Sequence, residues 1–475
     1  MESFEDEGVF WLPGKESDRR TGRIKFDAAE GAELNIMGGF GELAEQFNSQ
    51  ARILRIHGTA GKRYLTLDRC FNSDSTFEAP GIPRQTYYVG QIVAGHLFPE
   101  GEDLTFDKCS ITFDQLPMWV RRSGVQIKFE TQTPQLTTPP DRISIEFSQP
   151  QDEVVQFDDE VLRLTSTWAL GGNNVTSTYL NQDTVLEIKY PGARALDSIL
   201  NDVKYLQDLL TLATNAPTVP IEISLWRDDI AIESNSGSRR PQAMTYYASQ
   251  LAESVRLTEP QSAGRVLFQF QDIGGLATVA RWIKIGRQYQ TVLGSLLSIR
   301  YAAGLYVENR FNNVISAAES FHRLRFSNEL QPKDEYKQFV RDLVKAVPRE
   351  HRNWLSNQLQ YSNEPRLKKR LSEMAAYAGE AFAVLYDQAD AWVTVVTESR
   401  NRLTHHDSER EIKFEAGDLY FLTESVFALV MLCLFRECEI DDKALAAIAG
   451  SSSIQFLKAK LAGIVPRIYE QVKRK

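Results

Sequence analysis

The hydrophobic pattern of this chain changes its period near Gly275, and that change restricts the folds it can adopt. Before this point apolar residues alternate with polar ones and glycines interrupt the runs, as in β-strands. After it, apolar residues recur every three or four positions, as on one face of an α-helix. We therefore expect an α+β protein with a β-rich region at residues 1–275 and an all-α region at residues 276–475.

Short strands account for most of the first region. Near the N-terminus the runs are interrupted at Gly14, Gly22 and Gly31. The same alternation predicts strands at residues 51–57, 64–67, 87–93, 108–113, 125–129, 143–147, 161–167, 184–190 and 221–226. A helix at residues 196–210 interrupts them. Such strands between turn residues favour a sandwich or barrel-like fold, and one division of the region gives two lobes, 1–150 and 151–275.

Helices are expected to form the rest of the chain. One is marked by an apolar face that runs from Phe311 to Phe321. Others are predicted at residues 334–346, 366–379, 381–403, 417–438 and 451–471. Because the connections between them are short, we expect an antiparallel bundle.

The stretch with the strongest catalytic potential lies at the C-terminal end of the helix predicted at 381–403. The apolar stripe of this helix passes through Arg400, and a guanidinium on a core-facing line is costly unless it is paired or opens onto a polar cleft. Asn401 and His405 are four residues apart, so they share a face if the helix continues. Arg400, Asn401 and His405 are therefore the candidate catalytic residues.

Two alternatives stay open at this stretch. His406 also fits a looser spacing from Arg400, so either histidine can be the functional one. A histidine near the C-terminal end of a helix is also favoured by the helix dipole alone, which makes a solvated helix terminus an equally good interpretation. Glu319, on a helix expected to pack nearby, is a candidate partner that would orient Arg400.

Basic residues could add contacts to a nucleic acid. The run Arg366-Leu-Lys-Lys-Arg370 is the densest basic cluster in the helical region, and Arg402 adjoins the candidate site. We consider Arg366, Lys368, Lys369, Arg370 and Arg402 as RNA contacts, although a solvated helix face explains such a run more often. The net charge of −9 argues against a protein that coats nucleic acid, so any contact must be local or brief.

No metal or cofactor is expected. The four cysteines lack metal-ligand or redox spacing, and the sequence contains no HExxH motif and no complete P-loop. The N-terminus is acidic rather than apolar, and no run of 18 apolar residues follows it. We expect a cytoplasmic protein that does not contact the membrane.

The motif and the N-terminal segments together resemble a known family. Arg400-Asn401-x-x-x-His405 at the end of a helix is similar to the signature of HEPN domains, which are helical bundles. Four N-terminal segments, 10–14 (FWLPG), 22–27 (GRIKFD), 30–31 and 34–38 (LNIMG), resemble the β-rich region of bacterial ApeA-type abortive-infection proteins. Together the two resemblances touch both ends of the chain.

The resemblance implies a metal-independent endoribonuclease. In that family role, Arg400, Asn401 and His405 would cleave RNA, such as tRNA, by attack of the 2′-hydroxyl, leaving 2′,3′-cyclic phosphate and 5′-hydroxyl ends. The family also implies a homodimer through the helical domain, and a β-rich region that senses a phage-derived or infection-induced trigger in the bacterial cytoplasm and thereby controls this toxin.

Two other function classes remain. One is a non-catalytic receptor whose β-rich region captures a ligand while its bundle mediates assembly. An open cleft at Arg400 would favour the nuclease, and a sealed ion pair would favour the receptor. The other is a carbohydrate-active sandwich, which would need two carboxylates across one cleft.

Overall fold

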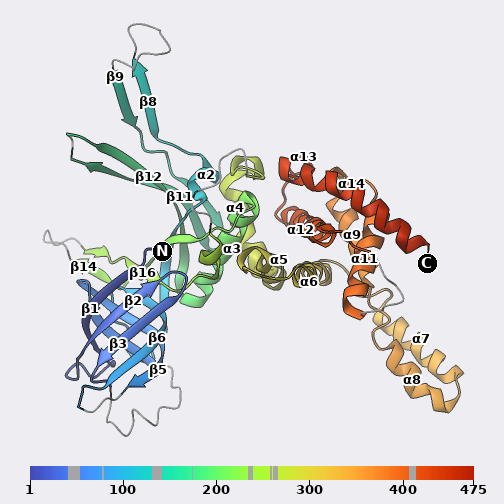
Figure 1. Ribbon diagram of the computed structural model, residues 1–475, viewed down its shortest axis with the longest axis horizontal. Coiled ribbons are helices and arrows are strands. Elements are labelled where there is room, and N and C mark those ends of the chain that lie inside the picture. Colours follow the sequence, from blue (N-terminus) through green and yellow to red (C-terminus); the bar gives the residue numbers. More distant parts are fainter. Residues whose placement is uncertain are drawn as a thin grey trace. The chain divides into compact units, whose positions relative to one another are not determined.

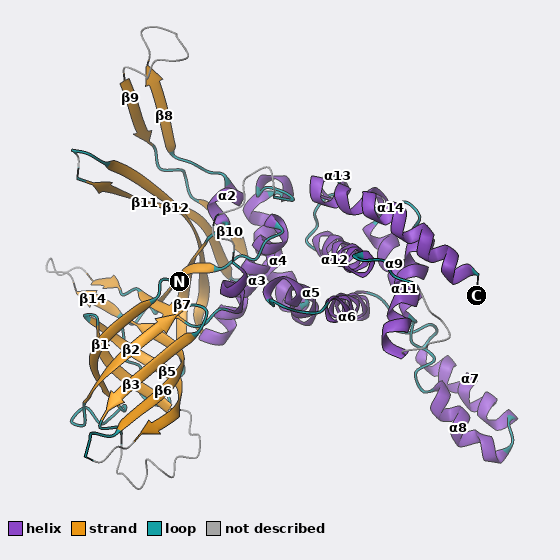
Figure 2. Ribbon diagram, in the orientation of Figure 1, coloured by secondary structure: helices purple, strands orange, loops and turns teal. Residues whose placement is uncertain are grey.

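The computed structural model describes residues 1–40, 54–76, 80–130, 142–173, 175–233, 239–256, 259, 266–405 and 413–474. The side chains of Leu251, Ala252, Thr404 and His405 also lie outside the described part. The chain forms two compact units, Met1–Arg281 and Trp282–Lys475. Strands build the first unit and helices build the second (Figure 1, Figure 2). The expected α+β class with its β-rich and all-α regions is confirmed.

A closed antiparallel barrel forms the first part of the N-terminal unit. Its strands follow the order β6-β3-β2-β1-β4-β5, and a further pairing of β5 with β6 closes the ring. They are β1 (Phe4–Trp11), β2 (Arg20–Asp27), β3 (Gly31–Met37), β4 (Leu54–Ala60), β5 (Arg63–Thr76) and β6 (Arg84–Ala94). The barrel-like fold expected for the first lobe is therefore present (Figure 2).

Strand β6 joins the barrel to a second stretch of the same sheet. It pairs with β3 at residues 84–89 and with β16 at residues 92–94. Beyond it the order continues as β16-β13-β7-β12-β11-β10. These strands are β7 (Thr105–Phe113), β10 (Glu153–Phe157), β11 (Glu160–Gly172), β12 (Thr178–Ala195), β13 (Pro220–Trp226) and β16 (Met244–Tyr247). Helix α3 (Leu196–Thr214) packs on β7 and β12 and buries its apolar face there.

Two hairpins extend beyond the rest of this sheet (Figure 1). One is the far half of β11 and β12, and the other is formed by β8 (Val125–Glu130) and β9 (Arg142–Phe147). Near the bases of the two hairpins, the ring centroids of Phe147 and Trp168 lie 5.6 Å apart. Both hairpins expose large apolar side chains, among them Ile127, Phe129, Ile145, Trp168 and Leu170.

The helical unit is built around α12 (Asp418–Glu437), whose side chains are mostly buried. Helices α6, α9 and α14 pack against it. The helices from the unit boundary onward are α4 (Gly275–Gln288), α5 (Gln290–Tyr301), α6 (Val307–Arg325), α7 (Lys333–Ala346), α8 (Arg349–Leu359), α9 (Leu367–Ala378), α10 (Glu380–Leu385), α11 (Ala389–His405), α12, α13 (Asp442–Ala449) and α14 (Ser452–Lys473). Helix α12 is long and apolar enough to pass for a membrane span by composition, but 83% of its most apolar 18-residue stretch is buried inside the protein.

The single helix predicted at 381–403 is wrong in one respect, because two helices occupy this stretch. Helix α10 ends at Leu385, where Tyr386 takes an extended conformation, and α11 begins at Ala389. The turn folds Phe382 back against Trp392, with ring centroids 5.1 Å apart. The three- and four-residue spacing of apolar residues continues from α10 into α11, because each helix buries the face that this spacing marks. The sequence pattern therefore did not reveal the break.

Helices α7 and α8 form a hairpin that is inserted between α6 and α9. Neither helix has a fully buried side chain in this completely described stretch. The base of the hairpin is closed by Asn363, whose backbone carbonyl accepts from Leu330 N and whose Oδ1 accepts from Gln331 N. The hairpin therefore stands on a fixed base, and that base adjoins the site described next.

Candidate active site

The candidate motif occupies the last turns of α11, which continues to His405. The side chains of Arg400 and Asn401 are partly buried. The preceding residue, Ser399, is fully buried, and its hydroxyl donates a hydrogen bond to Val395 O. On the backbone His405 follows Asn401 by four residues of helix, as the sequence predicted. The side chain of His405 and the whole of His406 lie outside the described residues.

Arg400 and Asn401 line an open cleft of about 550 Å³. Three segments form its walls: α6, the turn from α8 into α9, and α11. Its lining residues are Glu319, Arg323, Tyr361, Glu364, Pro365, Arg366, Leu367, Lys368, Arg370, Thr397, Glu398, Arg400 and Asn401. Glu319, the candidate partner of Arg400, thus lies in the same cleft as Arg400. Arg400 opens onto a cleft of the size usual for ligand sites.

Of the predicted basic contacts, Arg366 and Lys368 are exposed in this cleft. Arg370 differs from the expectation of an exposed RNA contact, because it is 2% exposed. Its guanidinium donates to Pro365 O at 2.8 Å, to Asn328 Oδ1 at 2.6 Å and to His322 Nδ1 at 3.0 Å. These bonds fix the Arg370 guanidinium within the wall of the cleft, where it is almost inaccessible to solvent.

Lys369 and Arg402 lie elsewhere. Lys369 Nζ is 3.7 Å from Glu373 Oε1, and the Arg402 guanidinium packs over the ring of Phe414 at 4.8 Å. Neither belongs to the lining of the cleft. A run of basic residues on a helix spreads over several faces, so only some of its members reach the cleft.

Buried groups beneath the cleft fix the protonation of His322. An arginine only donates hydrogen bonds, so His322 Nδ1 must accept from Arg370 and Nε2 must carry the proton. That Nε2–H donates to Glu373 Oε2 at 2.6 Å. Burial lowers the pKa of His322, and Glu373 opposes this effect while Arg370 adds to it. His322 is therefore a neutral structural residue rather than an acid or base of the cleft.

Sequence patterns did not identify Tyr361, Arg323 and Thr397 as members of the site. Tyr361 is 69% exposed and follows α8, where no periodic signal marks it. Arg323 lies one turn after Glu319 on α6, and this spacing was the one signal that could have added it. The assembly of these residues depends on how α6 and α11 pack, which no local pattern records.

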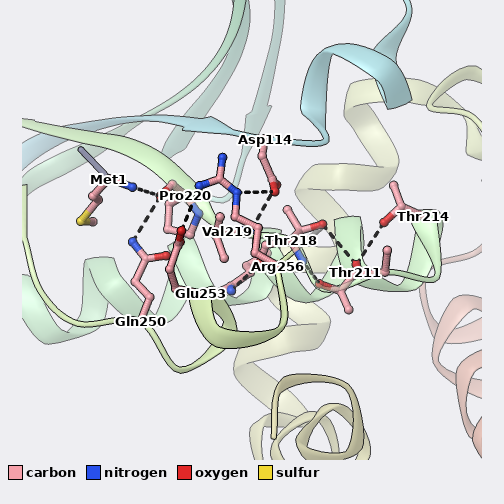
Figure 3. Close-up of polar contacts among 12 residues, drawn as sticks. Met1, Asp114, Thr211, Thr214, Thr218, Val219, Pro220, Gln250, Glu253 and Arg256 are labelled. Atoms are coloured by element: carbon pink, nitrogen blue, oxygen red, sulfur yellow. Dashed lines mark hydrogen bonds and ion pairs between the residues drawn. The ribbon is translucent and has the colours of Figure 1, made fainter. Parts of the chain in front are cut away.

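A second polar cluster lies in the N-terminal unit (Figure 3). Asp114 Oδ1 accepts from Val219 N at 3.1 Å, and Arg256 lies 3.3 Å from Asp114 Oδ2 and 3.0 Å from Glu253 Oε1. The Met1 amino group and Gln250 both donate to Pro220 O. Burial raises the pKa of Asp114. The cluster joins β13, the segment after β16 and the start of α2 (Leu116–Val120), and it serves to hold them together.

The described residues contain no group of three His, Cys, Asp or Glu side chains placed to hold a metal ion. Cys70, Cys109, Cys433 and Cys438 are all buried, and no disulfide joins them. Burial raises the pKa of the thiols of Cys70, Cys109 and Cys433, so these three are poor nucleophiles.

Comparison with known proteins gives two family matches. The family model described as ApeA N-terminal domain 1 matches residues 5–282, which is more than half of the chain. The model described as Apea-like HEPN matches residues 312–444, the part that contains most of α6, the residues of the cleft and α11. No curated protein and no solved structure matches the chain.

Proposed function

The chain belongs to the ApeA family, abortive-infection effectors with a HEPN domain, and from this premise we propose that it is a metal-independent endoribonuclease. The observation that carries this proposal is the open cleft at Arg400 and Asn401. An arginine sealed inside the bundle would have favoured a binding module instead. The basic side chains of Arg366 and Lys368 on the facing wall suit an RNA backbone.

In the proposed reaction the substrate 2′-oxygen attacks the adjacent phosphorus, and the bond from phosphorus to the 5′-oxygen breaks. His405 takes the 2′-hydroxyl proton or supplies one to the leaving 5′-oxygen, since a histidine pKa near 6.5 suits both steps. Arg400 stabilises the charge that builds on the phosphoryl oxygens, because its planar fork matches them. Asn401 binds the phosphate or orients the histidine. His406 is the alternative proton carrier.

The proposal is tested by RNA cleavage with the purified protein in excess EDTA. Wild type is compared with Arg400→Ala, His405→Ala and His406→Ala, using tRNA and an unstructured RNA. Arg349→Ala is the matched control, because this exposed arginine at the start of α8 lies outside the cleft. We expect cleavage that survives chelation, persists in Arg349→Ala and is lost in Arg400→Ala. Activity that persists in Arg400→Ala, or that EDTA abolishes, contradicts the mechanism.

We propose that the β-rich unit senses the infection-derived trigger, and the β8–β9 hairpin supports this role. On one of its faces Val125, Ile127 and Phe129 stand opposite Phe147, Ile145 and Ile143. The other face carries the ion pairs Lys128–Glu146 and Arg142–Glu130. A two-stranded hairpin with an exposed apolar face is marginal in water and is typical of a protein interaction site. The uncharged face suits a protein trigger rather than a nucleic acid.

Substitution of Ile127 and Ile145 by serine tests the sensor proposal. Both side chains are more than half exposed, so folding is expected to be unchanged. Bacteria carrying this double variant are expected to lose protection against phage, while Ile232→Ser, exposed on another hairpin, keeps it. Full protection by the double variant contradicts a sensor at this face.

We also propose that two chains pair through the helical domain, as the family implies. Light scattering of the purified protein is expected to give the mass of a dimer. A monomer at all concentrations would contradict this assembly. The competing function, a receptor that captures a ligand without cutting RNA, predicts binding by the β-rich unit and no cleavage under any condition.

A further inference from the structure

One side of the cleft carries an aromatic ring that the proposed reaction does not use. Tyr361 lies in the cleft that Arg400 and Asn401 line, and 69% of it is exposed. Its position is fixed by the turn after α8. The Tyr361 carbonyl accepts from Glu364 N at 3.1 Å, and the Tyr336 hydroxyl donates to Leu359 O at 2.7 Å. An exposed tyrosine on a fixed turn keeps a ring face open to a ligand.

Cationic side chains line the same cleft as this ring. Arg323, Arg366 and Lys368 line the same cleft. Arg323 is 3.7 Å from Glu364, whereas Arg366 and Lys368 form no ion pair within the described part of the chain. The cleft as a whole is lined by five cationic side chains and three carboxylates. An aromatic ring that shares a groove with an excess of cationic side chains is typical of surfaces that bind single-stranded nucleic acid.

The buried Arg370 holds this wall in place. Its bonds to Asn328 Oδ1 and Pro365 O join the chain segments that lead into and out of the α7–α8 hairpin. Tyr361 and Arg366 flank the second of these segments. The ring and the exposed cations therefore belong to one rigid wall, with Arg400 and Asn401 on another wall.

We propose that Tyr361 is a stacking platform for an unpaired nucleobase next to the bond that is cut, and that Arg366 and Lys368 bind the adjoining phosphate. This inference rests on the proposed RNA-cleaving function for its ligand. A base inside a duplex has both faces covered by its neighbours, so it cannot stack on Tyr361. The platform thus selects unpaired RNA, such as a loop, at the cut site.

The test measures binding rather than cleavage. The probe is a short fluorescent RNA in which every 2′-hydroxyl is methylated, so that it cannot be cut by 2′-oxygen attack. Its affinity for the full-length protein is followed by fluorescence anisotropy, as a single strand and after annealing to its complement. The wild type is expected to bind the single strand more tightly than the duplex.

Tyr361→Ala is expected to weaken single-strand binding about tenfold, as the removal of one stacking ring does. Tyr361→Phe keeps the ring and is expected to bind like wild type. Trp354→Ala is the matched control, because Trp354 is 63% exposed on α8 but outside the cleft. In the double variant Arg366→Gln and Lys368→Gln, the slope of log affinity against log salt is expected to become shallower by roughly 0.7 for each phosphate that is no longer neutralised.

Two outcomes overturn the proposal: a wild type that does not bind the single strand, or equal affinities for Tyr361→Ala and Trp354→Ala. The result is separable from that of the nuclease test. Tyr361-dependent binding without cleavage of unmodified RNA would retain the platform and favour the receptor over the nuclease. Cleavage with no effect of Tyr361→Ala on binding would do the reverse.

Discussion

At the scale of single residues, the N-terminal segments that carry the family resemblance have structural tasks. Phe10 is fully buried inside the barrel, where Gly22 and Gly58 leave space for its ring. Asp27 Oδ1 accepts from Ala29 N and Glu30 N and closes the turn between β2 and β3. These backbone bonds lower the pKa of Asp27. The resemblance in this region therefore records the barrel, while no residue in it identifies the trigger.

Gly58→Ala is expected to destabilise the β-rich unit. A Cβ at this position would lie 2.5 Å from Phe10 Cδ1, and the buried ring cannot move away. Overpacking of this kind costs about 1–3 kcal/mol in the free energy of unfolding, which urea denaturation measures. Gly192→Ala is the control, since a Cβ there meets nothing within 4 Å. Equal stability of the two variants would show that the ring is not confined.

His322→Gln is expected to make the free energy of unfolding decrease less steeply as the pH falls into mild acid. Burial lowers the pKa of His322 in the folded chain. As the pH falls, His322 therefore binds a proton in the unfolded chain before it does so in the folded chain. Its contribution to the free energy of unfolding is present in full above about pH 6.5 and decreases as the pH falls toward the folded-state pKa. A glutamine amide can accept from Arg370 and donate to Glu373 without titrating.

Urea denaturation at several pH values on either side of about 6.5 checks this expectation. His351→Gln, exposed on α8, should keep the wild-type pH dependence. If His322→Gln loses stability as steeply as wild type when the pH falls, then another group is responsible.

At the scale of elements, the sequence predicted that a helix or strand exists more reliably than it predicted where that element begins and ends. The strands at 184–190 and 64–67 belong to the longer β12 and β5, because pairing on both sides extends a strand past its apolar run. Helix α8 was not predicted, since it is strongly polar and has no buried side chain. The cleft needs α6, the α8–α9 turn and α11 to meet, so the sequence could indicate Glu319, the α11 wall and the basic run, but not how they assemble.

The break between α10 and α11 gives a sharp test. Ala389→Pro places proline at the first residue of α11, where its missing N–H and fixed φ are tolerated. We expect a change of less than about 1 kcal/mol in the free energy of unfolding. Thr394→Pro, inside α11, removes a helical hydrogen bond and should cost about 3 kcal/mol. A large loss from Ala389→Pro would indicate one continuous helix.

At the scale of the whole molecule, the change of pattern near Gly275 marks the first residue of α4, and the two compact units divide within this helix, at Arg281 and Trp282. Trp282 is fully buried and packs against Phe435 of α12, with ring centroids 5.6 Å apart. A boundary inside a helix produces no change in the hydrophobic period, so the sequence pattern did not mark it. A chain that starts at residue 275 keeps α4 whole and retains Trp282.

A chain of residues 275–475 is expected to fold and to cut RNA more actively than the full-length protein, if the β-rich unit restrains the nuclease. Removal of α4 as well leaves a cavity at Phe435 and should cost about 3–5 kcal/mol, the usual cost of losing a buried tryptophan. Cleavage assays and thermal unfolding of both truncated chains check this. A folded but silent 275–475 chain would favour the receptor over the nuclease.

Ring closure at β5 and β6 also determines how this protein resists aggregation. Among the described strands of the twelve-stranded sheet, β10 is the one hydrogen-bonded to a single neighbour along its length, and it spans five residues. Exposed strand edges are where foreign strands add and fibrils start. The closed barrel at one end and the short β10 at the other offer such growth little room. Within the described part of the chain, the far half of β11 and β12 pairs only within its own hairpin and keeps free edges there. Strand addition is therefore expected to start at this projecting hairpin rather than at the barrel.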